Sequence, residues 1–547
     1  MNGEDAAPAS VKMEEIMEIW IKSAEKNVTP MVVAALTQLK ASGGGELHFE
    51  KGEYHFYREG TRREFMAVSN NSACDKYMVF PIVDMENVTV DGHESVFVFH
   101  DVVFPFMISC SKNIVLRNFV CDTGVSPLVE FVIHHITDTG FDMDIDREKN
   151  PYFVAEGSLC FQRESEIVSG KKEFFSLHAL GCHKVQYFAT GACEADMSNL
   201  PAQLMKCDVE MTETGIRASY RADSPNRCRY SEGETVTSTI DGKRNVDVIC
   251  LDRSEDIEIS NITVGRGIGM GIVGQLSRNI LIDGFSTDVS FHSDGYQTLT
   301  ADSLHFINCD GKLEIRNCTI SDTMDDAINV HGMYTAVTGW GEDELCCAIK
   351  HQEQRYFNPY REGDCLEIID SKTFNIVAEF IVESSDFAEG SGADIIIRGH
   401  FTYGAEEVQE GFLVENPDRM PDLHLHHNHF YNFPHNRISG GGKMLVENNH
   451  FENCKGALLC LDLARYWYES GRVNHLVYRN NLLDNCNAWG GSAFLRIGVD
   501  GVPNEEAPKI HKRIEITGNV FKQIWHHAVE AGGVQELIIE GNQFDEE

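Results

Sequence analysis

Three aspartates stand one short sequence period apart and carry the side chains that acid/base chemistry needs. Asp302 lies in TADSLHF, and Asp325 and Asp326 open DDAINVHG, 23 and 24 residues further on. When one carboxyl group of such a cluster is protonated and another is ionised, the first can protonate the leaving oxygen of a glycosidic bond. The second can then activate a water or attack directly. These residues therefore predict a hydrolase that acts on glycosides.

The separation of 23 or 24 residues is the length of one coil in a parallel β-helix, where equivalent positions on adjacent coils lie ~5 Å apart. Neighbouring residues on an ideal strand face opposite ways, so Asp325 and Asp326 can share a cleft with Asp302 only where the backbone is bent or bulged. Three carboxylates in one cleft repel each other, and at least one should be protonated near neutral pH. The alternative is that they accept backbone N–H bonds at coil corners, as we expect for Asp91 and Asp283.

Further candidates for substrate binding surround these aspartates in the sequence. They are His292, Asp294, His305, Asn329 and His331 in the same window, Arg437 in NRISGGG, and Trp467 with Glu469 in YWYESG. An aromatic ring stacks on the apolar face of a sugar, and a carboxylate holds its hydroxyls. The alternative is that the histidines and aromatic residues only pack against the helix.

The run HLHHNH invites a metal site formed by His424, His426, His427 and His429. On a strand, His424 and His426 share one face while the other two lie near a turn, and no carboxylate has a fixed place beside them. The sequence also lacks the patterns of calcium loops, zinc proteases, phosphate-binding loops and serine hydrolases. We therefore expect neither a metal nor another cofactor.

A repeated unit must position these side chains. It consists of alternating apolar residues, one polar residue and then Asn or Gly, and it occurs ten times: VTVDGH, IVLRNF, IEISNI, ILIDGF, LEIRNC, LHLHHN, MLVENN, LVYRNN, IEITGN and LIIEGN. Several successive units start 21 to 26 residues apart, which predicts the coils of a right-handed parallel β-helix. The Asn or Gly tolerates the left-handed backbone of a tight corner. A structural asparagine ladder is expected from Asn317, Asn428, Asn448, Asn480, Asn519 and Asn542.

The ends and interruptions of the repeat define the expected organisation of this all-β protein. Thr29 and Pro30 predict the N-cap and first position of an amphipathic helix that ends at residues 43–45 and caps the N-terminal end. Two gaps in the repeat predict small barrel-like β domains that could wall a pocket or mediate assembly. The expected domains are 1–120 (cap helix and first coils), 121–250 (inserted β domain), 251–332 (coils with the catalytic motif), 333–420 (second inserted β domain) and 421–547 (last coils).

The acidic composition limits the partners. The formal net charge is −39, from 46 Lys and Arg against 85 Asp and Glu, which would repel nucleic acid. No apolar stretch approaches 18 residues and no signal peptide is visible. This favours no membrane contact and a cytoplasmic location, or secretion if a signal peptide has been trimmed. The 17 scattered cysteines favour free thiols. A carbohydrate is the expected partner, and a homo-oligomer is compatible with the faces of a β-helix.

The motifs resemble glycoside hydrolase family 110, bacterial α-1,3-galactosidases that act on terminal Galα1-3Gal, including the blood-group-B determinant. The matching text is GMGIVGQLSRNILIDG, TADSLHF, DDAINVHG, VENNHF and YWYESG, spread over residues 255 to 485. The resemblance implies an inverting exo-hydrolase on a β-helix with inserted β-barrel domains. It implies that Asp302, Asp325 and Asp326 are essential and that no metal takes part. HSDGYQ around Asp294 and NRISGGG around Arg437 diverge from the pattern, which leaves linkage and acceptor preference open.

Three other functions stay open on the sequence alone. Polygalacturonases are inverting β-helix hydrolases with an Asp followed one coil later by an Asp pair, but they need cationic residues that the charge of −39 does not favour. A noncatalytic, tailspike-like glycan-binding β-helix would have dispersed or corner-bonded aspartates and no pocket closing one end of its groove. A lyase would need an Arg or Lys base, usually with calcium.

Overall fold

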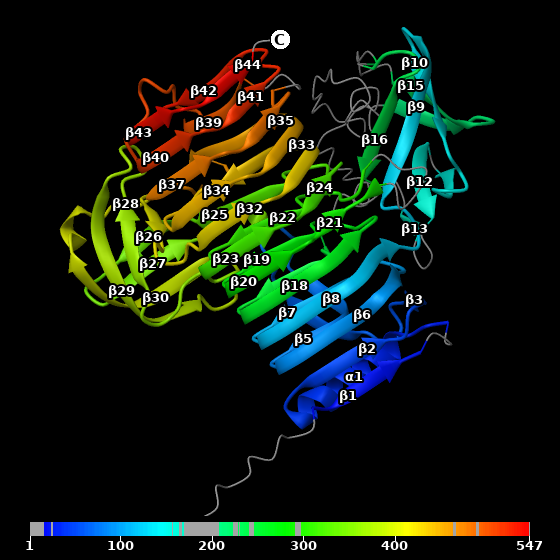
Figure 1. Cartoon of the computed structure of the whole chain (residues 1–547), viewed down its shortest axis with the longest axis horizontal. Coiled ribbons are helices and arrows are strands. Elements are labelled where there is room, and N and C mark those ends of the chain that lie inside the picture. The colour runs from blue at the N-terminus through cyan, green and yellow to red at the C-terminus, as the bar shows by residue number, and fades with distance from the viewer. Residues whose placement is uncertain are drawn as a thin grey trace, which may run out of the picture.

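The computed structural model describes residues 16–22, 26–155, 157–162, 167–168, 207–221, 228, 230–239, 245–289, 297–462, 466–487 and 492–545. Nearly all elements in these residues are strands. Figure 1 shows them stacked along one axis, from the end that holds the helix α1 (Thr29–Ser42) to the end that holds β44 (Gln543–Asp545). The predicted parallel β-helix is confirmed. Among the described residues, no helix has the length and apolarity needed to span a bilayer.

Within these residues the coils form three parallel sheets. The first sheet contains β1 (Glu18–Ile21), β2 (Gly45–Phe49), β6 (Glu86–Phe99), β8 (Lys112–Thr123), β18 (Glu255–Val264), β20 (Arg278–Asp283), β23 (Asp310–Arg316), β32 (Asp422–His426), β34 (Lys443–Glu447), β37 (His475–Arg479), β40 (His511–Thr517) and β43 (Val534–Glu540). The second contains β3 (Glu53–Phe56), the later halves of β6, β8 and β18, β21 (Ser286–Thr287), β24 (Thr319–Ser321), β33 (His429–Ile438), β35 (His450–Asp462), β38 (Leu482–Asp484), β41 (Val520–Lys522) and β44.

The third sheet is the one that carries the candidate site. It contains β4 (Arg62–Met66), β5 (Cys74–Val83), β7 (Phe104–Ser109), β17 (Ile249–Asp252), β19 (Ile272–Gln275), β22 (Leu304–Ile307), β25 (Ile328–Met333), the ends of β33 and β35, β39 (Ala493–Val499) and β42 (His527–Ala531). All of its pairings are parallel except that of β4 with β5. The short strand β36 (Glu469–Ser470) pairs antiparallel with β25.

The alternating sequence of each coil explains the continuous core. In β23, Leu313 and Ile315 are buried, whereas Glu314 and Arg316 between and after them are partly exposed. Apolar residues at the same register stack from coil to coil, among them Ile280, Leu313, Leu423, Met444, Leu476 and Ile514. Each such side chain stabilises the fold by roughly 1.5–3 kcal/mol when fully buried.

The corner after the first sheet contains two columns of residues, not the single asparagine ladder that the sequence predicts. Asn317, Asn448 and Asn480 have φ of 54°, 55° and 55°, so they supply the left-handed backbone of the corner. The residues one position later turn inward and form the hydrogen-bonded ladder, which consists of Asn428, Asn449, Asn481, Asn519 and Asn542. The predicted ladder mixed the two columns because both are asparagine in ENNH and RNNL.

The helix α1 closes the N-terminal end of the core, as predicted. It begins at Thr29, but Val28 and not Thr29 is the N-cap. The Thr29 hydroxyl donates to the carbonyl of Tyr57 instead, which ties the helix to the chain beyond β3. The helix ends at Gly43, where φ is 84°. Its buried face joins the main core through Val32, Ala35, Leu36 and Leu39.

Two insertions interrupt the coils on either side of the third sheet. The first leaves after β8 and returns at β17. Its described strands form a five-stranded antiparallel sheet, β9 (Leu128–Thr137), β10 (Gly140–Ile145), β14 (Cys207–Met211), β15 (Gly215–Tyr220) and β16 (Thr235–Thr239), and a smaller one, β11 (Tyr152–Ala155), β12 (Ser158–Gln162) and β13 (Ile167–Val168). These sheets are open, so the barrel-like form expected for this insertion is not seen in its described part.

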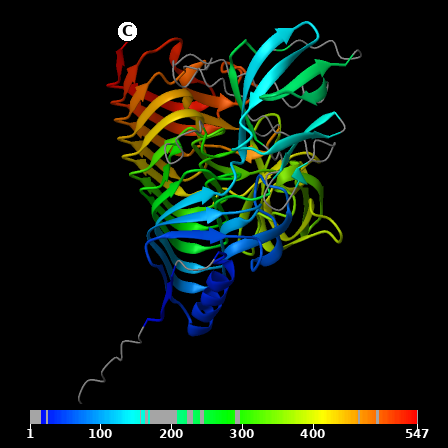
Figure 2. The ribbon, with the colours of Figure 1, turned by 90° about the vertical axis from the view of Figure 1, so that its right-hand side faces the viewer.

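The second insertion leaves after β25 and returns at β32, and it closes into a barrel as predicted. Its described strands are β26 (Thr335–Trp340), β27 (Glu344–Ala348), β28 (Cys365–Ile369), β29 (Ile376–Phe387), β30 (Asp394–Tyr403) and β31 (Leu413–Glu415), with the short helices η3 (Gln352–Gln354) and η4 (Ala405–Glu407). One insertion leaves the coil just before the third sheet and the other just after it, so both flank that sheet. Figure 2 shows both on the same side of the stack.

Candidate active site

The predicted residues gather on the outer face of the third sheet. In the pairing of β22 with β25, His305 lies opposite Asn329, and this register brings Asp302 beside Asp326 on the next coil. The N–H of Ser303 donates to the carbonyl of Asp326 at 2.9 Å. The same register continues through one column of outward side chains, here called the site column: Val273, His305, Asn329, Arg437, Leu459, Arg496 and Glu530.

The aspartate pair lies in a bend, which is the departure from an ideal strand that the sequence requires. Asp325 and Asp326 fall between β24 and β25, and the N–H of Asp326 donates to Oδ1 of Asp325 at 3.1 Å. Nε of Arg437 lies 3.5 Å from Oδ2 of Asp326. Burial raises the pKa of Asp326 well above its ordinary value. The Arg437 charge opposes this effect, and the charges of Asp325 and Asp302 add to it. Burial thus favours the protonated form of Asp326.

A chain of buried hydrogen bonds runs from Asp302 through two histidines. Oδ2 of Asp302 lies 2.8 Å from Nδ1 of His305, and Nε2 of His305 lies 3.1 Å from Nε2 of His331. Nδ1 of His331 lies 2.6 Å from the carbonyl of Gly332, and a carbonyl can only accept. Burial lowers the pKa of His331 to about 4, so this ring is neutral, with its proton on Nδ1. Nε2 of His305 must therefore donate to it, which leaves one proton shared between His305 and Asp302.

Glu469 supplies a fourth carboxylate beside the column. Its Oε2 lies 3.9 Å from Nε of Arg437, its Oε1 lies 3.6 Å from Nε2 of His331, and Asn70 donates to Oε1 at 3.4 Å. Burial alone would raise the pKa of Glu469, but the Arg437 charge opposes this effect and the pKa lies below its ordinary value. Glu469 is therefore ionised at neutral pH.

Two buried polar atoms at this site have no partner anywhere in the described part of the chain. They are Nη1 of Arg437 and Oδ1 of Asn329. A buried polar atom left without a hydrogen bond costs about 1–3 kcal/mol. One donor and one acceptor are thus available, next to the carboxylates, to hydroxyl groups of a ligand.

The other predicted binding residues have different outcomes. His292 and Asp294 lie outside the described residues. The Trp467 ring packs 4.4 Å from the ring of His351, which belongs to the barrel insertion, and it also packs against Leu459 and Leu461. Its use as a sugar platform stays a prediction.

The structure adds residues that the sequence did not single out. Asn70 comes from the segment between β4 and β5. From β33, Nδ1 of His435 lies 3.5 Å from Oδ1 of Asp326. Burial lowers the pKa of His435 well below the ordinary value. The charges of Lys455 and Arg496, from the next coils, add to this effect. His435 follows Asp326 by more than one hundred residues because the barrel lies between them, so no fixed spacing in the sequence could reveal it.

The N-terminal side of the site column is covered by the segment between β4 and β5. Val68 packs there with Met107, Met270 and Val273. The Ser69 N–H donates to Oε1 of Gln275 at 2.8 Å. Asn70 accepts a hydrogen bond from Gln354 of the barrel insertion at 3.3 Å. This segment therefore covers the N-terminal side of the site column, and the barrel insertion contacts it.

On the C-terminal side, the column leads into a cavity of 680 Å³. The cavity lies over β39 and β42, and its lining includes Leu461, Arg496, Asn504 and Glu530. Register places Arg496 two coils and Glu530 three coils beyond Arg437 on the same face. Two coils span roughly 10 Å, about the length of two sugar units. The site column therefore runs from its covered N-terminal side toward this open cavity.

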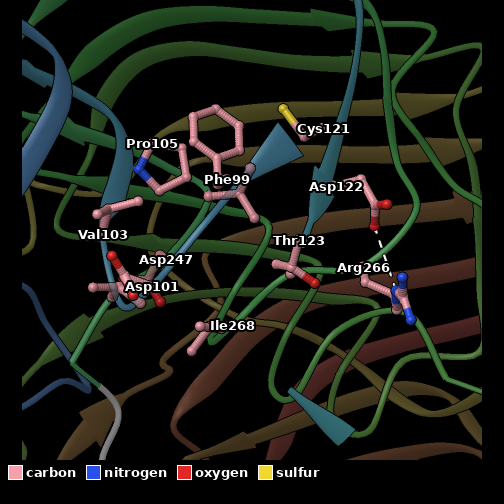
Figure 3. Close-up of a pocket in the computed structure, with 13 residues that line it drawn as sticks. Phe99, Asp101, Val103, Pro105, Cys121, Asp122, Thr123, Asp247, Arg266 and Ile268 are labelled. Atoms are coloured by element: carbon pink, nitrogen blue, oxygen red, sulfur yellow. Dashed lines mark hydrogen bonds and ion pairs between the residues drawn. The ribbon is translucent and has the colours of Figure 1, made fainter. Parts of the chain in front are cut away.

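Two further cavities lie at the root of the first insertion. One, of 310 Å³, has an apolar wall that includes Phe99, Val103 and Ile268, and Asp122 and Arg266 pair across its rim at 3.4 Å (Figure 3). The other, of 390 Å³, is lined by residues of the insertion, such as Lys149, and by Gln297 of the coil. Like the cavity over β39 and β42, neither is lined by any of the three predicted aspartates, and neither adjoins the site column.

No family model matches the chain, but curated relatives cover most of it. The chain is 25% identical over 556 residues to alpha-1,3-galactosidase B of Bacteroides thetaiotaomicron, covering 98% of this chain and 86% of the relative. It is 28% identical over 553 residues to an alpha-1,3-galactosidase B of Phocaeicola vulgatus (95% and 88%). It is 24% identical over 510 residues to alpha-1,3-galactosidase A of Shewanella woodyi (90% and 79%).

Similar solved structures include a hyperthermoactive exopolygalacturonase from Thermotoga maritima, with a TM-score of 0.40 and 11% identity over 97% of this chain and 93% of that one. Another is a tailspike protein mutant of E. coli bacteriophage HK620, with a TM-score of 0.37 and 10% identity over 95% and 58%. The sequence relatives support an enzyme of the glycoside hydrolase class, which is the class that the carboxylate cluster predicts.

Proposed function

We propose that this protein is an inverting exo-α-1,3-galactosidase of glycoside hydrolase family 110 that releases terminal α-1,3-linked galactose. The observation that carries the proposal is the coil-aligned pair Asp302 and Asp326, with Asp325 beside it, on a site column whose N-terminal side is covered by the segment between β4 and β5. A site covered on one side suits removal of a terminal sugar. The names of the relatives support galactose as that sugar.

In the proposed reaction, the carboxyl group of Asp326 donates its proton to the leaving glycosidic oxygen. Its raised pKa keeps that proton in place until the bond breaks. Either Asp302 or Asp325 acts as the base and takes a proton from the attacking water. The proton shared between His305 and Asp302 fixes the orientation of the Asp302 carboxylate. Attack by water in a single displacement inverts the anomeric centre.

The terminal galactose is placed over Asn329 and Arg437. Nη1 of Arg437 and Oδ1 of Asn329 offer a donor and an acceptor, and the ionised Glu469 can accept hydrogen bonds from further hydroxyls. The rest of the glycan extends over Leu459 toward Arg496 and Glu530, in the 680 Å³ cavity. A polygalacturonase-like activity is not favoured, because the curated relatives are named galactosidases.

The proposal is tested by incubating the protein with Galα1-3Gal, Galα1-4Gal and galacturonan while following the products by NMR. We expect galactose from Galα1-3Gal, with the β-anomer appearing first. Release of the α-anomer first would reject inversion. If none of the α-galactosides releases galactose, the galactosidase function is wrong. Galacturonan cleavage would instead support the alternative hydrolase.

A further inference from the structure

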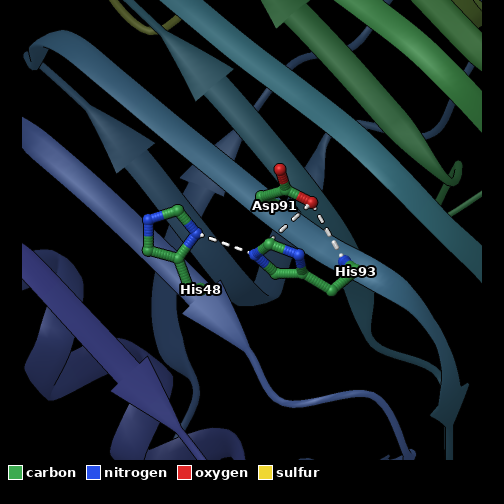
Figure 4. A group of neighbouring side chains, drawn as sticks. All are labelled: His48, Asp91 and His93. Carbon is green, nitrogen blue, oxygen red and sulfur yellow. Dashed lines mark hydrogen bonds and ion pairs between the residues drawn. The ribbon is translucent and has the colours of Figure 1, made fainter.

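At the N-terminal end of the β-helix, well away from the site column, a cluster of metal-binding side chains joins two adjacent coils. His48 lies on β2, and Asp91 and His93 lie on β6, whose residue Asp91 pairs with His48 in register. Nδ1 of His48 lies 3.1 Å from Nε2 of His93, and Oδ1 of Asp91 lies 3.9 Å from that same Nε2. Figure 4 shows the two rings and the carboxylate converging from the two strands.

A local distortion of β6 aims His93 into this cluster. The register of β6 against β8 shifts between Asp91 and Ser95, and His93 itself has φ of 46°. In this irregular turn the N–H of His93 donates to Oδ1 of Asp91 at 3.0 Å. Bulges of this kind re-aim a side chain, and they concentrate at functional positions. The strained turn is what lets His93 meet His48 instead of facing away from it.

We propose that His48, His93 and Asp91 bind a divalent transition-metal ion of the Zn²⁺ class. A tetrahedral zinc ion holds nitrogen ligands at about 2.0–2.1 Å, which puts two ligands about 3.3 Å apart. The observed nitrogen–nitrogen separation already matches that value, so binding requires the two rings to turn without moving apart. Asp91 is oriented by hydrogen bonds from the N–H of His93 at 3.0 Å, the Asn118 side chain at 3.1 Å and Arg117 at 2.7 Å.

The surroundings of His48 are those of a metal ligand. Its other nitrogen, Nε2, lies 3.0 Å from Oε2 of Glu46, so the ring donates there and presents a lone pair on Nδ1. A carboxylate behind the ligating histidine fixes its tautomer and raises its basicity in many metal sites. The Trp20 ring stacks on both imidazoles, at 4.6 Å from His48 and 5.2 Å from His93. It shields one side of the cluster from solvent.

Two other groups of histidines and carboxylates fit a metal ion less well. The rings of His429 and His450 are stacked at 4.5 Å with an angle of only 6°. Their in-plane lone pairs therefore run parallel and do not meet at one ion. In the other group, Glu314 is paired with two cations, Lys312 and Arg316, whereas Asp91 is paired with one, Arg117. The HLHHNH run, for which the sequence predicts no metal, contributes to both of these groups.

The chain contains its own matched control seven residues after each histidine, with His55 on β3 and His100 directly after β6. Nδ1 of His55 lies 2.9 Å from Nε2 of His100, and Nε2 of His55 lies 3.1 Å from Oε1 of Glu53. This pair repeats the arrangement of His48, His93 and Glu46. The residue opposite His55 in register is Val98, where the first pair has Asp91. Only the first pair therefore combines two histidines with a carboxylate on the facing strand.

The test compares Zn²⁺ binding by the wild-type full-length protein, His93→Gln and His100→Gln, using calorimetry after removal of metals with a chelator. We expect His93→Gln to bind about one equivalent fewer Zn²⁺ per chain, while His100→Gln binds as much as the wild type. Thermal unfolding should shift upward on adding Zn²⁺, and this shift should shrink only in His93→Gln, because a ligand that binds the native state stabilises it. Equal Zn²⁺ stoichiometry in all three proteins would overturn the proposal.

A second measurement holds even if His93→Gln does not fold. Co²⁺ quenches a tryptophan that lies close to it, and Trp20 is one of five tryptophans in the chain. We expect Co²⁺ to quench a saturable part of the emission in the wild type and in His100→Gln. That part should disappear in Trp20→Phe. Saturable quenching that survives in Trp20→Phe, or none in the wild type, would contradict the site. The result is independent of any galactosidase assay.

Discussion

At the scale of single residues, the catalytic proposal depends on which carboxyl group holds a proton. Asp326→Asn should lower kcat for galactose release by about 10²–10⁴-fold, because an amide cannot act as the acid and such catalysis contributes that much. Asp302→Asn should lower kcat by a similar factor, because it removes a carboxyl group that can take the proton of the attacking water. The control is Asp283→Asn at a coil corner, where Asp283 pairs with Arg316 and Asn317. It should keep wild-type kcat. Near-normal rates in both active-site variants, with native circular dichroism, would reject the assignment.

His305 acts through Asp302, so it is a positioning residue. His305→Asn removes the ring that shares a proton with Asp302. We expect kcat to fall by on the order of tenfold, less than for a direct acid or base, while KM changes little. The shape of the pH profile should also change, because Oδ2 of Asp302 loses the ring nitrogen that lies 2.8 Å from it. A pH profile of kcat/KM checks this. A parallel loss at every pH would indicate a merely structural role.

At the scale of elements, the strands β35, β39 and β42 should select the acceptor part of the glycan. Arg496 lines the open cavity and lies 3.7 Å from Glu530. Arg496→Ala should raise KM for a tetrasaccharide that ends in Galα1-3Gal, by roughly tenfold for the loss of one charged hydrogen bond. It should leave kcat/KM unchanged for a small aryl α-galactoside, which ends before the cavity.

The matched variant for this groove is Arg513→Ala on β40. Arg513 also pairs with glutamates, Glu515 and Glu536, but on the first sheet. Arg513→Ala should leave KM for the tetrasaccharide and kcat/KM for the aryl α-galactoside unchanged. If Arg496→Ala affects both substrates equally, the cavity over β39 and β42 does not bind the acceptor.

The asparagine ladder is the second element with a measurable contribution. Asn481 donates to the carbonyl of Val446 and to Oδ1 of Asn519, and its own Oδ1 accepts from the N–H and the side chain of Asn449. Asn481→Ala should lower the free energy of unfolding by on the order of 3 kcal/mol, because it leaves buried groups unpaired. Asn542→Ala, at the more exposed end of the ladder, should cost less. Urea denaturation of both variants measures the difference, and equal costs would contradict the ladder.

At the scale of the whole molecule, the repeat in the sequence predicts the coils, but it does not reveal which strands pair within the barrel. Residues such as Leu313 and Ile315 alternate with polar ones in every unit, so the repeat is visible without a structure. The closed barrel depends instead on pairings such as that of β26 with β31, which join strands far apart in sequence. The proximity of Asp302 and Asp326 could be predicted, because one coil length separates them in the sequence. Asn70 and His435 were not, since an overlying segment and the barrel insertion bring them in from distant positions.

The pH dependence of folding should likewise reflect buried groups outside the active site. Burial lowers the pKa of His511 to about 4. Its ring donates to the carbonyl of Gly498 and accepts from the N–H of Val473. A pKa below the unfolded value means that this stability is present above about pH 6.5 and is lost as pH falls toward 4. The contribution is about 3 kcal/mol. His511→Asn should therefore be less stable at pH 7 and should show a flatter decline between pH 6.5 and 4.

Asp322 should show the opposite sign. Burial raises its pKa to about 6, above the unfolded value, so its contribution is fully present below about pH 4 and is lost as pH rises through 6. Asp322→Asn keeps an acceptor for Asn432 without an ionisable proton, and it should be more stable than the wild type by about 2–3 kcal/mol at pH 7.5. The advantage should vanish near pH 4. Urea titrations of both variants across this range give the slopes, and slopes of the same sign would show that these two buried groups do not set the acid response.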